Sequence, residues 1–429
     1  MKREKQYNKP ARYALAMFGL SIMGYMYTTY GTFFYTDRIG LSLAAIGVGH
    51  IFFAVWDAFN DPICGYLSDR TRSRWGRRRP WLMVAVPLMT IAAICFFNPP
   101  STLGTGLAMA VYFTGFLMLT ESANTVATVN YHSLLPELFR DTAKRNAANS
   151  LRQALQLVGM IIGVSLVPLL AQGIGYQTTA LLLGILGGAL VIYSILGTRE
   201  DKSFAEIKPP RLRDSLKALV ANRNFWFVSV SHFLYQATTG LLLAGIPFYI
   251  KYYLEEPDAM ATILSASVFV TAIPSMFLWY KLINKFGTLK IWRLALLTLG
   301  LSLVPLFFSN ALWFATVAGA FVGLGIAGVT ANLDMVNSEL IEEDARRFGV
   351  RREATYFSGI SFVTRLSGLV RSGVFFLLVF IFGFESSAVP GDRPGMAARF
   401  MMIVFPAILM ALSFSVSLLV RFKEDKDAS

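Results

Sequence analysis

Twelve runs of about twenty apolar residues are the feature that most constrains the fold of this sequence. A helix rises about 1.5 Å per residue, so about 20 residues cross the roughly 30 Å hydrocarbon core of a bilayer. Because every backbone polar group in lipid must be paired within its own segment, we expect these runs to be helices. The sequence therefore predicts an all-α membrane protein with twelve transmembrane helices, at 14–35, 43–67, 81–97, 107–131, 147–171, 179–196, 225–249, 261–280, 291–308, 312–335, 354–382 and 400–420.

The composition agrees, because 55% hydrophobic and only 15% charged residues are too apolar for a soluble domain of this length. The net charge of +13 is typical of some nucleic-acid-binding proteins, but here its placement indicates topology instead. Lys and Arg concentrate in alternate loops and at both ends, and the other loops carry only Arg38, Lys251, Arg393 and Arg399. The positive-inside rule then predicts a multi-pass protein of the cell inner (plasma) membrane with both termini cytoplasmic. The basic start leads into an apolar run too long for a signal peptide, so we expect an uncleaved first helix.

A polar, proline-broken stretch between the sixth and seventh runs predicts two halves. We expect an N-terminal six-helix half at 1–198, a cytoplasmic linker at 199–223 and a C-terminal six-helix half at 224–429. A glycine-anchored basic turn follows the second run at 65–79 and is echoed weakly after the eighth at 281–290. Repeats of this kind are typical of transporters that hold their solute between the two halves.

The second run carries acidic residues inside the membrane, where an ionised side chain is costly and needs a partner. Asp57, Asn60 and Asp61 lie at i, i+3 and i+4 and therefore on one helical face. Two carboxylates this close are tolerable if one is protonated or if a small cation lies between them, and hard oxygen ligands suit Na⁺. The alternative is that one aspartate forms a salt bridge with an arginine on another helix.

Polar residues on four other runs predict a wet cavity for a solute. The fourth run has a stripe of Glu121, Thr125, Thr128 and His132 at i, i+4, i+7 and i+11. We expect the cavity wall to be completed by Ser21 and Tyr25 of the first run, Arg152 of the fifth and Arg365 of the eleventh. The arginines suit either an anionic or polyhydroxylated solute or the neutralisation of the acidic pair. Hydroxyl groups alone also serve helix packing, which is the simpler interpretation of Thr128.

The sequence resembles the glycoside-pentoside-hexuronide:cation symporters, the melibiose permease group of the major facilitator superfamily. The resemblance covers nearly the whole chain and rests mainly on the element Asp57-Ala58-Phe59-Asn60-Asp61-Pro62 with the basic loop that follows it. It implies the major facilitator fold. It also implies a cation-binding site, for Na⁺ in the first instance, formed by Asp57, Asn60, Asp61 and Thr125.

The solute site departs from the melibiose permease pattern. Ser21 and Thr128 stand where that permease has its sugar-gripping acids, and His132 stands where it has a tryptophan. Arg152 matches, Arg365 replaces a lysine, and Glu121 lies where the permease is uncharged. The resemblance therefore implies a retained cation site and a rebuilt solute site.

The leading hypothesis is secondary active transport, in which Na⁺, or else H⁺ or Li⁺, is carried with a small solute, a sugar or glycoside, by alternating access. A lysolipid-like or anionic amphiphile is the alternative solute, and a non-transporting membrane scaffold or sensor is the alternative of another class. The sequence has no phosphate-binding loop, nucleophile elbow or nicotinamide motif, so an enzyme is not expected. We expect no cofactor besides the coupling cation, no nucleic-acid partner, and a monomer in the lipid bilayer.

Overall fold

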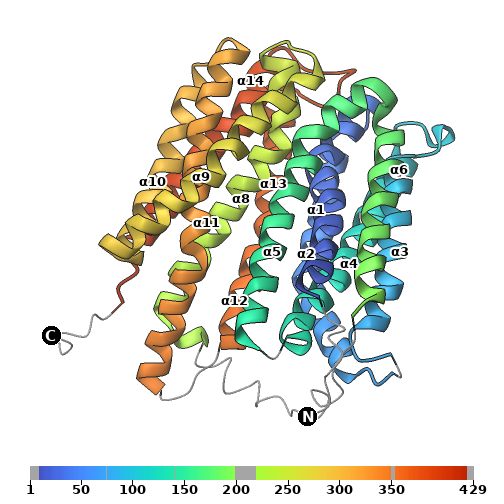
Figure 1. Ribbon diagram of the computed structural model, residues 1–429. Helices are drawn as coiled ribbons and strands as arrows, with labels where there is room; N and C mark the ends of the chain where they lie inside the picture. Colours follow the sequence, from blue (N-terminus) through green and yellow to red (C-terminus); the bar gives the residue numbers. More distant parts are fainter. Residues whose placement is uncertain (1–8, 74, 140, 199–218, 349–352, 423–429) are drawn as a thin grey trace. The chain divides into compact units, whose positions relative to one another are not determined.

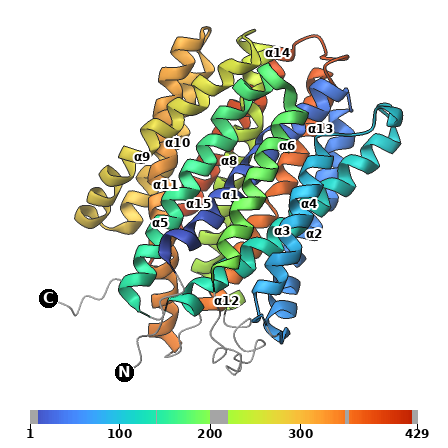
Figure 2. The same ribbon diagram turned by 45° about the vertical axis from the view of Figure 1, so that its right-hand side comes forward.

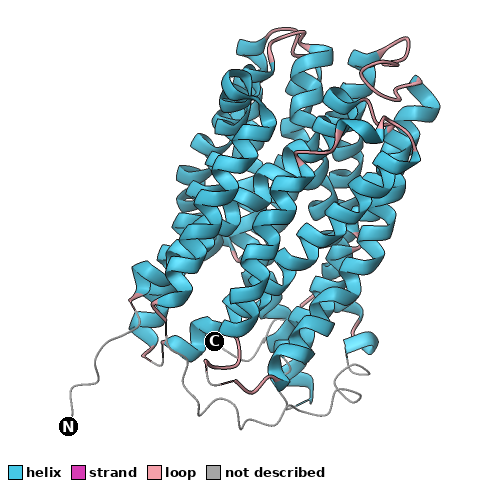
Figure 3. Ribbon diagram, turned by 90° about the vertical axis from the view of Figure 1, so that its right-hand side faces the viewer, coloured by secondary structure: helices cyan, strands magenta, loops and turns pink. Residues whose placement is uncertain are grey.

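The computed structural model describes residues 9–73, 75–139, 141–198, 219–348 and 353–422. Throughout these ranges every regular element is a helix, as Figure 3 shows. This confirms the predicted all-α class, and it follows from the need of each segment in lipid to pair its own backbone groups.

The chain divides into two compact units. The first is Met1–Lys208 with Glu385–Pro390, and the second is Pro209–Phe384 with Gly391–Ser429. The boundary near residue 208 falls inside the stretch expected as a linker, whose residues 199–218 lie outside the described ones.

The first unit contains six long helices, of which α2, α3 and α4 run side by side (Figure 2). A helix α1 packs on α5 and α6. The bounds are α1 Pro10–Phe33, continued by the π-helical turn η1 Phe34–Ile39, α2 Leu43–Arg70, α3 Arg79–Phe96, the short turn η2 Ser101–Leu103, α4 Leu107–Leu138, α5 Thr142–Ile161, continued by η3 Ile162–Leu166, and α6 Val167–Leu196.

In the second unit, α11 packs against both α9 and α10 (Figure 1, yellow to orange), and α15 packs against α8. The bounds are α8 Arg223–Phe248 with η5 Tyr249–Tyr253, η6 Asp258–Met260, α9 Ala261–Phe286, α10 Thr288–Phe307, α11 Leu312–Phe348, α12 Glu353–Arg365, α13 Ser367–Phe382, α14 Pro394–Arg399, η7 Phe400–Val404 and α15 Phe405–Ser417.

Nine helical stretches of the described residues are long and apolar enough to span a membrane. One of them, Ala147–Leu196, holds 50 residues and reverses at Gly175, whose φ of 79° is left-handed and suits glycine. Separating the two spans there, and adding α1 and α4, gives the twelve expected spans in the described part of the chain. The polar residues of α4, discussed below, lower its hydropathy without changing its length.

Several helices extend beyond their predicted bounds, α4 for example to Leu138, and two spans differ more strongly. The predicted 354–382 helix is interrupted at Leu366, so that Arg365 is the last residue of α12. The predicted 312–335 helix continues to Phe348, because the charged residues after 335 extend the helix beyond its apolar part.

Glycines set the closest helix contacts. A Cβ built on Gly159 of α5 would lie 2.7 Å from the carbonyl oxygen of Phe18, and one on Gly163 would lie 2.8 Å from that of Ile22, both on α1. In the second unit a Cβ on Gly323 of α11 would overlap the carbonyl oxygen of Val268 on α9. Without a hydrophobic force between helices in lipid, such small-residue contacts supply the packing.

The segment 385–390 belongs by position in the chain to the connection between α13 and α14, but it packs in the first unit. The backbone N–H of Leu43, the first residue of α2, donates to the carbonyl oxygen of Glu385 at 2.7 Å. The Ser387 hydroxyl donates to the carbonyl oxygen of Asp37 at 2.7 Å. The segment therefore caps the start of α2.

Candidate functional site

The expected cation site begins on one face of α2. Asp57 is 6% exposed and Asn60 is 4% exposed, so both polar side chains are buried as the i, i+3 spacing predicted. Asp61 is in α2 as well, but its side chain lies outside the described residues. Burial of a carboxylate and an amide in a membrane helix indicates a polar interior site rather than contact with lipid.

The third expected element of the site, Thr125 of α4, is 2% exposed. Its level relative to α2 is fixed by two contacts between the helices. The rings of His50 and Phe113 lie 5.8 Å apart edge to face, and the Trp56 indole N–H donates to the Ser122 hydroxyl at 2.7 Å. The contacts occur in the same order along both helices, so α2 and α4 run in the same direction.

The residue numbers in these contacts differ by 63 and by 66, which gives the register of α4 against α2. With the second offset, Thr125 is level with position 59 of α2, between Asp57 and Asn60. By this register Asp57, Asn60 and Thr125 lie at about the same level along α2 and α4, and their role as cation ligands stays a prediction. Each supplies a side-chain oxygen, the ligand type that a hard monovalent cation prefers.

Asn60 has one neighbour that the sequence did not suggest. The Cys64 thiol, one turn further along α2, lies 3.4 Å from Asn60 Oδ1 and donates to it. The other amide atom, Nδ2, is buried without a hydrogen-bond partner among the described residues. A buried amide with an unused position is one that a ligand or a rotation of the amide can satisfy.

The polar side chains of the predicted solute stripe on α4 have different hydrogen-bond partners. Thr128 donates its hydroxyl hydrogen to backbone carbonyls of its own helix, those of Asn124 at 2.9 Å and Thr125 at 3.2 Å. Glu121 accepts from the Asn124 amide at 3.4 Å. His132 is exposed, and its Nδ1 lies 3.2 Å from a terminal nitrogen of Arg152 on α5. The stripe therefore reaches the predicted arginine at His132.

The residues predicted on α1 lie against α5. Tyr25 is half-buried and lies next to the side chain of Gln156. Ser21 is 3% exposed, and its Cβ would lie 2.8 Å from a Cβ on Gly159. Ser21 thus lies in the α1–α5 packing contact, and its solute-binding role stays a prediction. Arg365 is in the second unit, half-buried at the end of α12, and its solute-binding role stays a prediction.

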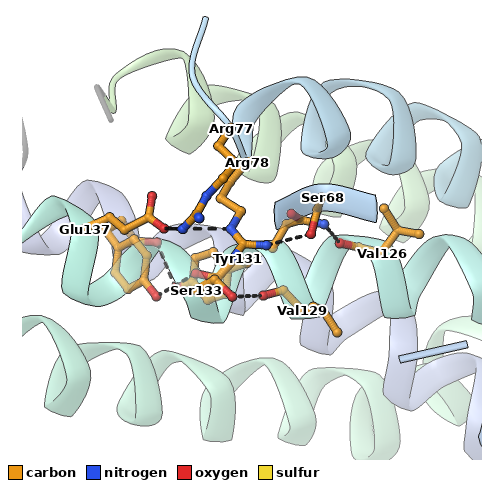
Figure 4. Close-up of polar contacts among 10 residues, drawn as sticks. Ser68, Arg77, Arg78, Val126, Val129, Tyr131, Ser133 and Glu137 are labelled. Atoms are coloured by element: carbon orange, nitrogen blue, oxygen red, sulfur yellow. Dashed lines mark hydrogen bonds and ion pairs between the residues drawn. The ribbon is translucent and has the colours of Figure 1, made fainter. Parts of the chain in front are cut away.

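The basic loop after α2 closes onto α4 (Figure 4). Arg77 donates to Glu137 Oε1 at 2.6 Å, and Arg78 donates to the Ser68 hydroxyl at 2.6 Å while its Nε lies 3.8 Å from the same Glu137 oxygen. Glu137 is 6% exposed and lies in the last turn of α4, and Ser68 is on the last turn of α2. Arg78 therefore joins the ends of the two helices that carry the candidate cation site.

A family comparison matches almost the complete chain, from residue 12 to residue 426, and the family it identifies is MFS/sugar transport protein. The chain belongs to this family.

Two relatives are similar to this chain over most of their own length. The chain is 26% identical over 423 residues to the uncharacterized symporter YnaJ of Bacillus subtilis (strain 168), covering 94% of this chain and 89% of that protein. It is 26% identical over 431 residues to the isoprimeverose transporter of Lactiplantibacillus pentosus, covering 96% and 88%. The relatives are transporters.

A solved structure shows the same fold at lower identity. The crystal structure of the nucleoside transporter NupG matches with a TM-score of 0.71 and 13% identity, covering 96% of this chain and 99% of that one. The predicted major facilitator fold is thereby confirmed, and the chain is a multi-pass membrane protein.

Sequence reasoning missed several polar residues of this family member. Ser122, which fixes the register of α4 by accepting from Trp56, adjoins the predicted stripe but lies off its spacing. Asn149, whose Oδ1 accepts from Arg152 Nε at 3.1 Å, lies three residues before that arginine on the same face. The i, i+3 spacing was available as a signal for Asn149, whereas the partner of Trp56 depends on how two separate helices pack.

Proposed function

We propose that this chain is a cation-coupled symporter of a sugar-type solute that works by alternating access. Membership in a sugar-transport family and the names of the relatives, a symporter and an isoprimeverose transporter, support this. The coupling cation is Na⁺ in the first instance, with H⁺ and Li⁺ as alternatives. As a multi-pass protein it operates in the cell inner membrane.

The observation that carries the proposal is the sequestered group of oxygens at one level of α2 and α4. Asp57, Asn60 and Thr125 are each no more than 6% exposed, although they lie in helices that span the membrane. The Asn60 amide has an unused position, and turning it by 180° presents its oxygen in place of the unpartnered nitrogen. Asp61, next in line on α2, adds the second carboxylate of the proposed cation site.

A bound cation offsets the cost of a buried carboxylate, and this supplies the coupling. If the cation favours the conformation that binds solute, the solute must raise cation affinity by the same factor. Couplings of this type amount to about 5–150-fold in affinity. We therefore expect Na⁺ to raise solute affinity by a factor in that range.

The test is solute uptake into proteoliposomes that contain the purified full chain and an imposed Na⁺, Li⁺ or proton gradient. Asp57→Asn keeps the side-chain volume and removes the charge, so it should abolish cation-stimulated uptake. Asp392→Asn makes the same chemical change on an exposed residue outside the helices and should leave uptake unchanged. Full cation-dependent uptake by the Asp57→Asn variant would contradict the proposal.

The same assay separates the alternatives. Uptake driven by a proton gradient alone assigns the coupling to H⁺. Cation-stimulated transport of a lysolipid in place of sugars retains the symport mechanism and replaces the solute. No flux of any solute under any gradient leaves the scaffold or sensor interpretation.

A further inference from the structure

The contact between His132 and Arg152 fixes the protonation state of the histidine ring. A guanidinium carries five N–H donors and no acceptor, so Arg152 is the donor in this 3.2 Å hydrogen bond. His132 Nδ1 must therefore accept, which it does only in the neutral ring with the proton on Nε2. The exposed edge of His132 then offers an N–H donor at Nε2.

Arg152 keeps its charge and most of its donors in this arrangement. Its two hydrogen bonds go to neutral acceptors, Asn149 Oδ1 at 3.1 Å and His132 Nδ1 at 3.2 Å. Two of the five N–H groups are thus used, and three remain. Among the side chains that the structure describes, no carboxylate forms an ion pair with Arg152. The half-buried guanidinium is consequently a positive charge that its protein neighbours do not neutralise.

Glu121, the acid on the same stripe as His132, is too far along α4 to neutralise this charge by contact. Glu121 precedes His132 by eleven residues on the same stripe, which corresponds to about 16.5 Å along α4. Its Oε2 accepts from Asn124. The acceptor-rich and donor-rich parts of the stripe are therefore separate.

The aromatic contact next to His132 is packed, and both of its hydroxyl hydrogens are used in hydrogen bonds. Tyr131 adjoins His132 and stacks on Tyr13 of α1, with ring centroids 4.5 Å apart and an interplanar angle of 11°. Each tyrosine hydroxyl donates to the backbone carbonyl of the other residue, at 3.1 and 3.0 Å. His132 thus adjoins a packed aromatic contact between α1 and α4, with the ring centroids of Tyr131 and His132 5.7 Å apart.

We propose that the pair binds a carboxylate on the transported solute, which is therefore a sugar acid rather than a neutral sugar. This inference rests on the proposed function, of which it names the solute class. The two terminal nitrogens of Arg152 match the two oxygens of a carboxylate, and His132 Nε2–H adds a third donor. Neutral hydroxyl groups form no ion pair with the positive charge of Arg152, and a cationic solute is repelled by it.

His132 acts here as a specificity-determining residue, since it both orients Arg152 and contributes a donor. Glutamine can replace both functions, with its Oε1 accepting from Arg152 and its Nε2 donating to the solute. Leucine can replace neither. This difference separates recognition from a purely structural role.

The test measures dissociation constants of the purified full chain, at saturating Na⁺, for matched acidic and neutral probes. Methyl glucuronide and methyl glucoside form one pair, and galacturonate and galactose a second, each pair differing at the carboxylate. A hydrogen-bonded charge pair is worth about tenfold or more in affinity, so we expect the acidic member to bind at least about tenfold more tightly. Arg152→Gln and His132→Leu should bring the ratio towards one, and His132→Gln should retain it. Gln153→Leu, an exposed neighbour on α5, should leave it unchanged.

Equal or tighter binding of the neutral members, or no binding of any acidic member, overturns the sugar-acid inference. A neutral sugar that binds more tightly with Na⁺ leaves the symport proposal intact while this inference fails. An acidic probe that binds through Arg152 without any effect of Na⁺, Li⁺ or protons supports the solute class and contradicts the symport proposal. A ratio that falls equally in His132→Gln and His132→Leu contradicts the assigned role of His132.

Discussion

Substitution of Gly159 by alanine should separate α5 from α1 and disturb the solute side of the site. The added Cβ would lie 2.7 Å from the Phe18 carbonyl oxygen, whereas ordinary contacts begin at 3.4 Å, so the helices must move apart by 0.7 Å. Because Phe18 contributes backbone rather than a flexible side chain, the contact cannot be relieved by a rotamer change. Overpacking of this kind costs about 1–3 kcal/mol.

Gly115→Ala is the matched control, since Gly115 is also in a long helix of the first unit and a Cβ there meets nothing within 4 Å. Both substitutions gain the same helix preference of alanine, about 0.5–1 kcal/mol, so their difference isolates the clash. Thermal unfolding in detergent should show a lower midpoint for Gly159→Ala than for Gly115→Ala. Solute affinity should fall as well, because Arg152 and Gln156 move with α5. Equal midpoints for the two variants would refute the close-contact reasoning.

Two further substitutions test the connections between α2 and α4. Trp56→Phe keeps an aromatic ring but removes the N–H that donates to Ser122, so it should cost about 0.5–1.5 kcal/mol in stability and weaken cation binding, measured by Na⁺-dependent thermal stabilisation. An unchanged Na⁺ response would show that this bond does not set the level of Thr125. Glu137→Ala removes the buried carboxylate that Arg77 and Arg78 share and should cost about 3–5 kcal/mol, whereas Glu137→Gln still accepts a hydrogen bond and should cost less. Equal unfolding midpoints for the two Glu137 variants would contradict the role given to its charge.

The helices and their polar faces could be predicted from the sequence because both depend on local spacing. Asp57 and Asn60 share a face by the i, i+3 rule and are buried as expected. Contacts between helices could not be predicted in the same way. Trp56 and Ser122 are 66 residues apart, and nothing in either neighbourhood specifies the register that their hydrogen bond records.

Ser21 shows a second limit of prediction from the sequence. Its place in a polar series on the first helix predicted a cavity-lining residue, but that periodicity does not distinguish a cavity from a close helix neighbour. In the structure Gly159 lets α5 approach the backbone of α1 around Ser21, so Ser21 lies in a helix contact while its solute-binding role stays a prediction. A single sequence does not show which glycine on one helix will lie against a small polar residue on another.

The placement of 385–390 has a consequence for any attempt to study the halves as independent polypeptides. A fragment ending at the linker would lack the carbonyl of Glu385 that accepts from the Leu43 N–H, and the serine that bonds to Asp37. The isolated N-terminal fragment would therefore start its second helix uncapped. Complementation by a separately expressed C-terminal fragment would have to return six residues across the cut to complete the first unit.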